Sequence, residues 1–379
     1  MTVDQWGPGV LVRADGSGGY TAWTAQRIAP APGLAEHRAY TGLGEEQRRI
    51  ETEAAELAWL SGLCRPGGRF ELRCTGGPAD PVRAVLLTRA DAPTPAAAVA
   101  AAKDVVGVLP AHVTGEPADV EVELTALTAD GSPPAAVDLR EIRKRIDVRT
   151  IARPSSPRRQ AAIAAPLAPS GRSWELLWTE LARQPVPTAL SVALEPVQLL
   201  PEAGLLFHQF AELYARLAAP VDGSPLWQGA RRGDPAAEAG RDFFDDAIRR
   251  YLGPVFRLRI TLAAAGPLPP GLAQLAADQV GGAVLTPEPS ERGLSWRNFT
   301  TLALDPLPLT HRPPVDQGDW GDVEQELSGL VDRQEAAAAF RLPYEFTGRA
   351  VRLFERSAPG PLPPRSAPSG PLPGLSPLL

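Results

Sequence analysis

Few side chains in this sequence have the types and spacing that catalysis or metal binding requires. The four histidines are His37, His112, His208 and His311. None of them has another histidine or a cysteine within five residues, so the spacing of a zinc site is missing. The two lysines, Lys103 and Lys144, do not follow a glycine, as the lysine of a phosphate-binding loop must. The sequence therefore predicts no nucleotide-hydrolysing site, and we expect no catalytic residue, metal or cofactor.

One group of acidic residues could place carboxylates on a single helical face. Asp242, Asp245 and Asp246 have the spacing that a metal or an acid/base pair would use. Arg249 and Arg250 follow at a distance of four residues, which is the spacing of ion pairs along a helix. We therefore expect surface ion pairs here. His208 is expected on the outer side of its helix.

Positive charge is concentrated in residues 140–159. Its basic members are Arg140, Arg143, Lys144, Arg145, Arg149, Arg153, Arg158 and Arg159. Only Glu141 and Asp147 oppose them, so the stretch carries +6 in a chain of net charge −6. Such a stretch could neutralise phosphates, but it contains no aromatic residue that would stack on bases. Three interpretations stay open: a solvated linker, a site for an acidic protein, and a nucleic-acid site formed by Arg140, Arg143, Lys144, Arg145, Arg149 and Arg153.

Hydrophobic spacing predicts the elements around these residues, and their order indicates an α+β fold. In residues 1–130 we expect a hairpin over 10–13 and 20–28, helices over 45–64 and 96–108, and strands over 70–74, 82–88 and 120–127. Residues 131–172 are expected to be a basic, proline-containing linker. The fold class is thus two α/β-layer subdomains on mostly antiparallel sheets, with a disordered proline-rich tail.

The second α+β region is predicted over residues 173–345. We expect helices over 174–181, 207–217, 243–252, 268–280 and 320–330, the last running toward 336–340, and strands over 190–194, 255–262 and 299–304. The tail is residues 346–379. From residue 357 it holds eight prolines and a single charge, Arg365, which predicts disorder.

Composition and the first residues of the sequence indicate the cellular compartment of the protein. The 379 residues are 44% hydrophobic and 22% charged, which is typical of globular domains. No apolar run approaches the roughly 20 residues of a membrane span. The first residues have neither the positive charge nor the apolar stretch of a secretion signal, so we expect the cytosol. Cys64 and Cys74 are expected to be buried thiols.

Several short segments resemble the region before the motor domain of HerA-type and conjugative-transfer (type IV secretion) DNA-translocating ATPases. They are Glu56–Leu60, Arg69–Arg73, Ala189–Pro196, Glu335–Pro343 and Pro371–Leu375. The Walker A loop, Walker B acid and arginine finger of such ATPases are missing, so no catalytic residue carries over. The resemblance implies a non-catalytic structural or adaptor protein that acts with a separately encoded ATPase. It also implies possible contact with DNA and assembly into a homo-oligomer.

In such ATPases the segment similar to Glu335–Pro343 leads toward the motor domain. The resemblance therefore places a partner interface at Phe340, Arg341 and Leu342. The competing interpretation is that Phe340 packs within its own domain. Two other functions remain open: a nucleic-acid-binding accessory protein that uses residues 140–159, and an enzyme with an unrecognised site.

Overall fold

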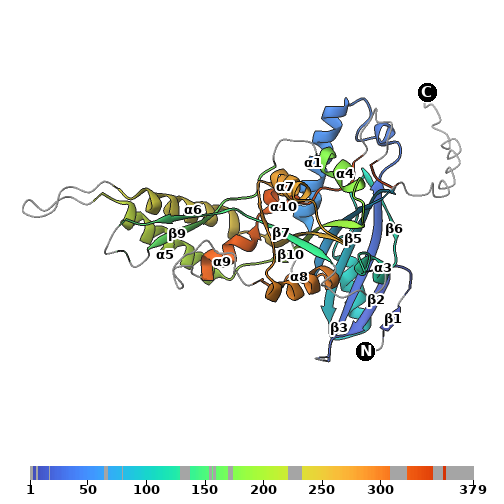
Figure 1. Cartoon of the computed structure of the whole chain (residues 1–379), viewed down its shortest axis with the longest axis horizontal. Helices are drawn as coiled ribbons and strands as arrows, with labels where there is room; N and C mark the ends of the chain where they lie inside the picture. The colour runs from blue at the N-terminus through green and yellow to red at the C-terminus, as the bar shows by residue number, and fades with distance from the viewer. Residues whose placement is uncertain are drawn as a thin grey trace, which may run out of the picture.

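A large, mostly antiparallel sheet with helices on both faces organises the protein, as the predicted α+β class requires (Figure 1). The computed structural model describes residues 3–5, 7–16, 18–63, 67–78, 80–128, 137–152, 156, 159–169, 174–220, 233–307, 322–344 and 353–355. Within these described residues the sheet has eleven strands: β1 (Val3–Gln5), β2 (Val10–Ala14), β3 (Tyr20–Pro30), β4 (Arg69–Gly77), β5 (Asp80–Ala92), β6 (Val113–Pro117), β7 (Asp138–Arg143), β10 (Thr188–Val197), β11 (Val255–Ala264), β12 (Ala283–Leu285) and β13 (Leu330–Val331).

Both predicted α+β regions contribute to this one sheet. Its strand order is β1-β2-β3-β5-β4-β10-β11-β7-β12, with β6 beside β3 and β13 beside β11. β4 of the first region pairs with β10 of the second from Phe70↔Leu194 to Gly76↔Thr188. The predicted linker also takes part, because its residues 138–143 form β7 against β11. Residues 138–143 are therefore a strand of the sheet and not part of a linker.

The main hydrophobic core lies on one face of the sheet. The helices covering it are α1 (Glu45–Gly62), α4 (Glu175–Ala182), α7 (Pro270–Val280) and α10 (Arg333–Ala339). α2 (Pro95–Asp104) lies on this same face, where the Thr88 hydroxyl of β5 donates to the Ala102 carbonyl. The other face is covered by α3 (Val120–Leu124) and α8 (Pro289–Thr301). β4 is therefore buried on both faces: Phe70 and Leu72 enter the main core, while Glu71 and Arg73 point toward α3 and α8.

A second lobe projects from the sheet where a helical hairpin is inserted between neighbouring strands (Figure 1). β10 leads into α5 (Pro201–Ala218), and α6 (Pro235–Tyr251) leads back into β11. Phe210 stacks on Phe244 at 4.9 Å between ring centroids. Gly240 permits this close helix packing, because a Cβ there would lie 2.7 Å from the Tyr214 ring. The β8 (Ile146–Thr150) and β9 (Gln160–Ala164) hairpin and α9 (Asp322–Gly329) complete the lobe.

Most predicted elements are present, and two predicted strands are helices. Residues 120–124 form α3, which begins because the Asp119 carboxylate accepts hydrogen bonds from two backbone amides of the first turn. Residues 299–301 close α8, which starts with a capping box between Glu288 and Glu291. The late helix is also divided, because β13 separates α9 from α10.

The last described residues of the chain pack against the rest of the protein. Residues 353–355 lie in the predicted tail, yet Leu353 and Phe354 are buried, and Phe354 packs on Trp178 with a ring distance of 5.6 Å. The predicted disorder from residue 357 falls outside the described residues. Cys74 is a buried free thiol, whereas Cys64 is also outside them. None of the described helices is both long and apolar enough to cross a membrane.

Candidate functional site

A pocket opens where the edge of β11 passes from one neighbouring strand to another. β7 pairs with Ile260–Ala264 of β11, and β13 pairs with Phe256 and Arg257. Leu258 and Arg259 have no strand partner on that edge among the described residues. The chain diverges here because β7 ends at Arg143 and enters the second lobe. A cavity of about 350 Å³ occupies the gap, a volume typical of small-molecule sites.

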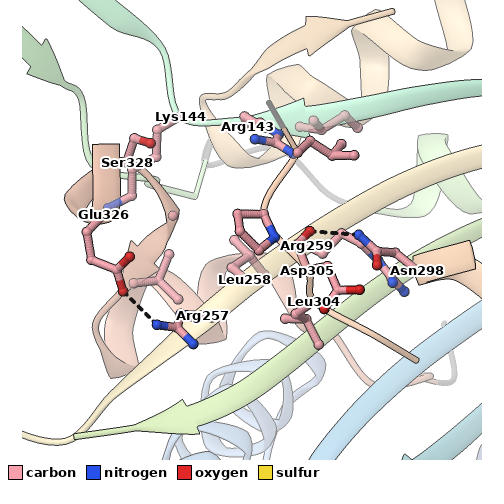
Figure 2. A pocket seen from close by; sticks show the side chains of 15 residues that line it. Arg143, Lys144, Arg257, Leu258, Arg259, Asn298, Leu304, Asp305, Glu326 and Ser328 are labelled. Atoms are coloured by element: carbon pink, nitrogen blue, oxygen red, sulfur yellow. Dashed lines mark hydrogen bonds and ion pairs between the residues drawn. The ribbon is translucent and has the colours of Figure 1, made fainter. Parts of the chain in front are cut away.

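The lining of this pocket is rich in charged and polar side chains. It consists of Ile142, Arg143, Lys144, Arg257, Leu258, Arg259, Asn298, Leu304, Asp305, Pro306, Leu307, Glu326, Ser328, Gly329 and Val331. Figure 2 shows Arg143 and Lys144 at one end, Arg257 and Glu326 on one side, and Arg259, Asn298 and Asp305 on the other. Four different parts of the chain therefore meet around one opening.

Two of the cations in the lining are held by acidic partners. Arg257 donates to Glu326 at 2.9 Å. Lys144 lies 2.8 Å from Glu335 and donates to the Tyr251 hydroxyl at 2.7 Å. Burial lowers the pKa of Lys144, while the Glu335 carboxylate opposes that shift. Lys144 is thus an internal, paired cation and is not available to a ligand.

A buried charge network forms the wall behind the pocket. Glu71 accepts from Arg73 at 2.7 Å and from Arg259 at 2.6 Å. Arg73 also donates to the carbonyl oxygens of Glu123 and Phe299, both at 2.6 Å. These carbonyls lie near the C-terminal ends of α3 and α8, where a cation complements the helix dipole. Arg73 therefore ties both helices to the sheet.

Glu141 extends the network toward the pocket. Its carboxylate accepts from the hydroxyls of Ser295 and Thr261, the latter at 3.3 Å. Burial raises the pKa of the Glu141 carboxyl above its ordinary value of 4.5, and Arg143 and Arg259 oppose this rise. Arg73, Arg143 and Arg259 thus face two carboxyls, Glu71 and Glu141. With both carboxyls counted as ionised, the group keeps one positive charge in excess.

Arg143 accounts for that excess. Among the described residues no group accepts a hydrogen bond from its guanidinium or forms a salt bridge with it, and its charge acts only through space on Glu141. The side chain is partly exposed and borders the cavity. A partly enclosed arginine without a hydrogen-bonding partner is suited to hold an anionic group.

The predicted basic stretch does not form a single surface. Arg140 is paired with Asp138, Lys144 is buried, and Arg143 borders the pocket. Arg145 and Arg149 are exposed around β8, and Arg149 is paired with Asp147 at 2.7 Å. Arg153 and Arg158 lie outside the described residues.

The predicted partner segment is largely internal. Phe340 is fully buried between Trp59 and Phe70, and Leu342 is buried as well. Arg341 is half-buried and forms ion pairs with Glu53 and Glu56 at 2.9 and 3.2 Å. Phe340 therefore packs within its own chain, the competing interpretation drawn from the sequence, and only Arg341 reaches the surface.

The structure also places the other polar residues noted in the sequence. Asp246 pairs with Arg249 and Arg250 at 3.2 and 3.6 Å, the predicted surface ion pairs. His208 is exposed, as predicted. His112 is buried and lies 3.1 Å from Glu56. Within the described parts of the chain, no group of three or more His, Cys, Asp or Glu side chains could hold a metal ion.

Sequence reasoning missed Glu71, Arg73, Arg259 and Glu141. For Glu71, Arg73 and Arg259 the only local signal is a charged residue at every second position of an otherwise apolar strand, and Glu141 lies in a strand with no such alternation. That pattern is typical of a strand with one solvated face.

Compared with known protein families and curated sequences, the chain matches no family model and no curated sequence at a significant level.

A substitution at Glu141 should change the pH dependence of stability. A carboxyl with a raised pKa in the folded state stabilises the protein most below its ordinary pKa of 4.5, and that contribution is lost as the pH rises through the raised value. We expect Glu141→Gln to gain free energy of unfolding relative to the wild type above pH 4.5. The gain should be about 1.4 kcal/mol per unit by which the pKa is raised.

Urea unfolding at several pH values between about 4 and 9 measures this difference. Glu180→Gln, at a partly exposed helical site paired with Arg183, is the control and should show no such trend. A pH-independent difference between wild type and Glu141→Gln would contradict the prediction.

Proposed function

We propose that the chain is a non-catalytic adaptor protein in the cytosol, which acts with a separately encoded DNA-translocating ATPase. Two features support the proposal. One is the resemblance of its segments to the region before the motor domain of such ATPases. The other, which carries the proposal, is a group of exposed leucines at the base of the second lobe.

These leucines lie where α5 begins and α6 ends. Leu200 and Leu205 are 72% and 64% exposed, and Leu206 and Leu252 are also exposed. Leu252 belongs to the same surface, because it packs against Gly204 in the first turn of α5. Apolar side chains that gather on a surface mark sites of protein contact. The patch formed by Leu200, Leu205, Leu206 and Leu252 is the surface we assign to the ATPase.

Changing the two most exposed leucines to aspartate tests the proposal. Leu200→Asp/Leu205→Asp should weaken binding to the ATPase at least tenfold, about 1.4 kcal/mol, because charges replace apolar contacts at the interface. Unfolding temperature should not fall, since both side chains already face water and an aspartate at Leu200 would cap the N-terminus of α5. Binding is measured by calorimetry with the P-loop ATPase that copurifies with the chain from its native host.

Val108→Asp is the matched control, because Val108 is 90% exposed and lies outside the patch. It should bind like the wild type. Unchanged binding by the double variant, or copurification without any P-loop ATPase, would refute the proposal. Steeply salt-dependent DNA binding that is lost in Arg145→Ala/Arg149→Ala would favour a nucleic-acid accessory protein instead.

A further inference from the structure

We propose that the pocket at the edge of β11 binds a small organic carboxylate, with Arg143 as its anion-binding residue. This is independent of the proposed adaptor function, because the leucine patch lies at the start of α5 and shares no residue with the pocket. The inference rests on three observations: the charge around the cavity, its enclosure, and the unpaired strand edge.

The charge argument identifies an anion. Around the cavity, Arg257 is paired with Glu326, Lys144 with Glu335, and Asp305 with Arg297 at 2.7 Å. In the remaining group, three arginines face two carboxyls, Glu71 and Glu141. One positive charge is left, and within the described part of the chain the guanidinium without a hydrogen-bonding partner is that of Arg143. An anion in the cavity would neutralise it.

The single excess positive charge favours a carboxylate ligand over a phosphate. A phosphate monoester carries about −1.5 to −2 at pH 7, whereas a carboxylate carries a single charge. A guanidinium also presents parallel N–H donors that match the two oxygens of a carboxylate.

The cavity leaves room for the part of the ligand that lies beyond its carboxylate. Leu258, Leu304, Pro306, Leu307 and Val331 provide an apolar part of the lining. Leu258 and Arg259 have no strand partner on the pocket side among the described residues, so the one of them whose N–H and C=O point to that edge can pair with a ligand. A cavity of about 350 Å³ accommodates a small molecule with one acid group and an apolar or hydrogen-bonding body.

Ligand-observed NMR can test this with a library of small aliphatic and aromatic monocarboxylates, each paired with its primary amide and with a phosphate monoester of similar size. We expect several carboxylates to bind the full-length wild type. Their amides and the phosphate monoesters should bind at least tenfold more weakly. Arg143→Met should lower carboxylate affinity at least tenfold while its unfolding temperature stays that of the wild type.

Arg145→Met is the matched control, since Arg145 is an exposed cation two residues away and does not border the pocket. It should bind carboxylates like the wild type. The proposal fails if no carboxylate binds at millimolar concentration, if amides or phosphate monoesters bind as well as carboxylates, or if Arg143→Met and Arg145→Met lose affinity equally. Failure of ATPase binding would leave these outcomes unaffected, so the two proposals can be judged separately.

Discussion

Arg73→Leu is expected to lower the free energy of unfolding by about 3–5 kcal/mol, because it takes one of two counter-charges from the buried Glu71 carboxylate. Arg73 and Glu71 are fully buried, with 2.7 Å between their bonded atoms. The substitution also removes both donors to the carbonyls at the ends of α3 and α8, and the contact with the Phe299 ring at 4.0 Å. Leucine fills much of the volume but satisfies none of these acceptors.

Urea unfolding followed by circular dichroism measures the loss for Arg73→Leu. Arg183→Leu serves as the control, because Arg183 is 70% exposed and pairs with Glu180 on the surface. Exposed pairs of this kind contribute about 0–1 kcal/mol. If Arg73→Leu lost no more than Arg183→Leu, the buried network would not be what fastens α3 and α8 to the sheet.

The same network shows where sequence reasoning succeeds and where it stops. The strands around Phe70–Cys74 and Val255–Leu262 are predicted correctly, because apolar residues alternate along them. Alternation alone places Glu71 and Arg259 on a solvated face. They are buried because α3 and α8 cover that face, and parts of these two helices were the ones predicted as strands.

Both wrong elements have a local cause. Val120, Val122 and Leu124 alternate as in a strand, yet Asp119 caps a short helix there. Residues 299–304 are apolar enough for a strand, but the helix that contains Phe299 starts ten residues earlier with its capping box. In both places a capping residue that precedes the apolar residues starts a helix. The strand predictions were wrong because they considered the apolar residues without that capping residue.

The candidate pocket depends on contacts that are distant in the sequence. Arg143 was among the basic residues predicted to bind a ligand, although nucleic acid was the ligand considered. Lys144, the next residue, is directed into the protein and pairs with Glu335, 191 residues later in the chain. Arg143 and Lys144 point to different places because β7 ends at Arg143 and leaves β11 there. Strand pairing, and not local composition, determines where β7 ends.

Phe340 carries the second large expected effect. The sequence left two roles open for it, an anchor for a partner or a core residue, and they predict different outcomes for Phe340→Ala. In the structure its ring lies 5.4 Å from that of Phe70 and 6.0 Å from that of Trp59, with no exposed surface. It also ends α10, where its amide donates to the Ala336 carbonyl at 2.8 Å.

We therefore expect Phe340→Ala to lower the free energy of unfolding by about 3–5 kcal/mol, the usual effect of removing a buried aromatic ring and leaving a cavity. Urea unfolding measures this loss. Leu176→Ala, at a 54% exposed site on α4, is the control and should stay within about 0.5 kcal/mol of the wild type. ATPase affinity of the folded fraction should be normal, because the ring faces Trp59 and Phe70 and not solvent. A variant that kept full stability but lost the ATPase would instead make Phe340 the anchor that the family resemblance implied.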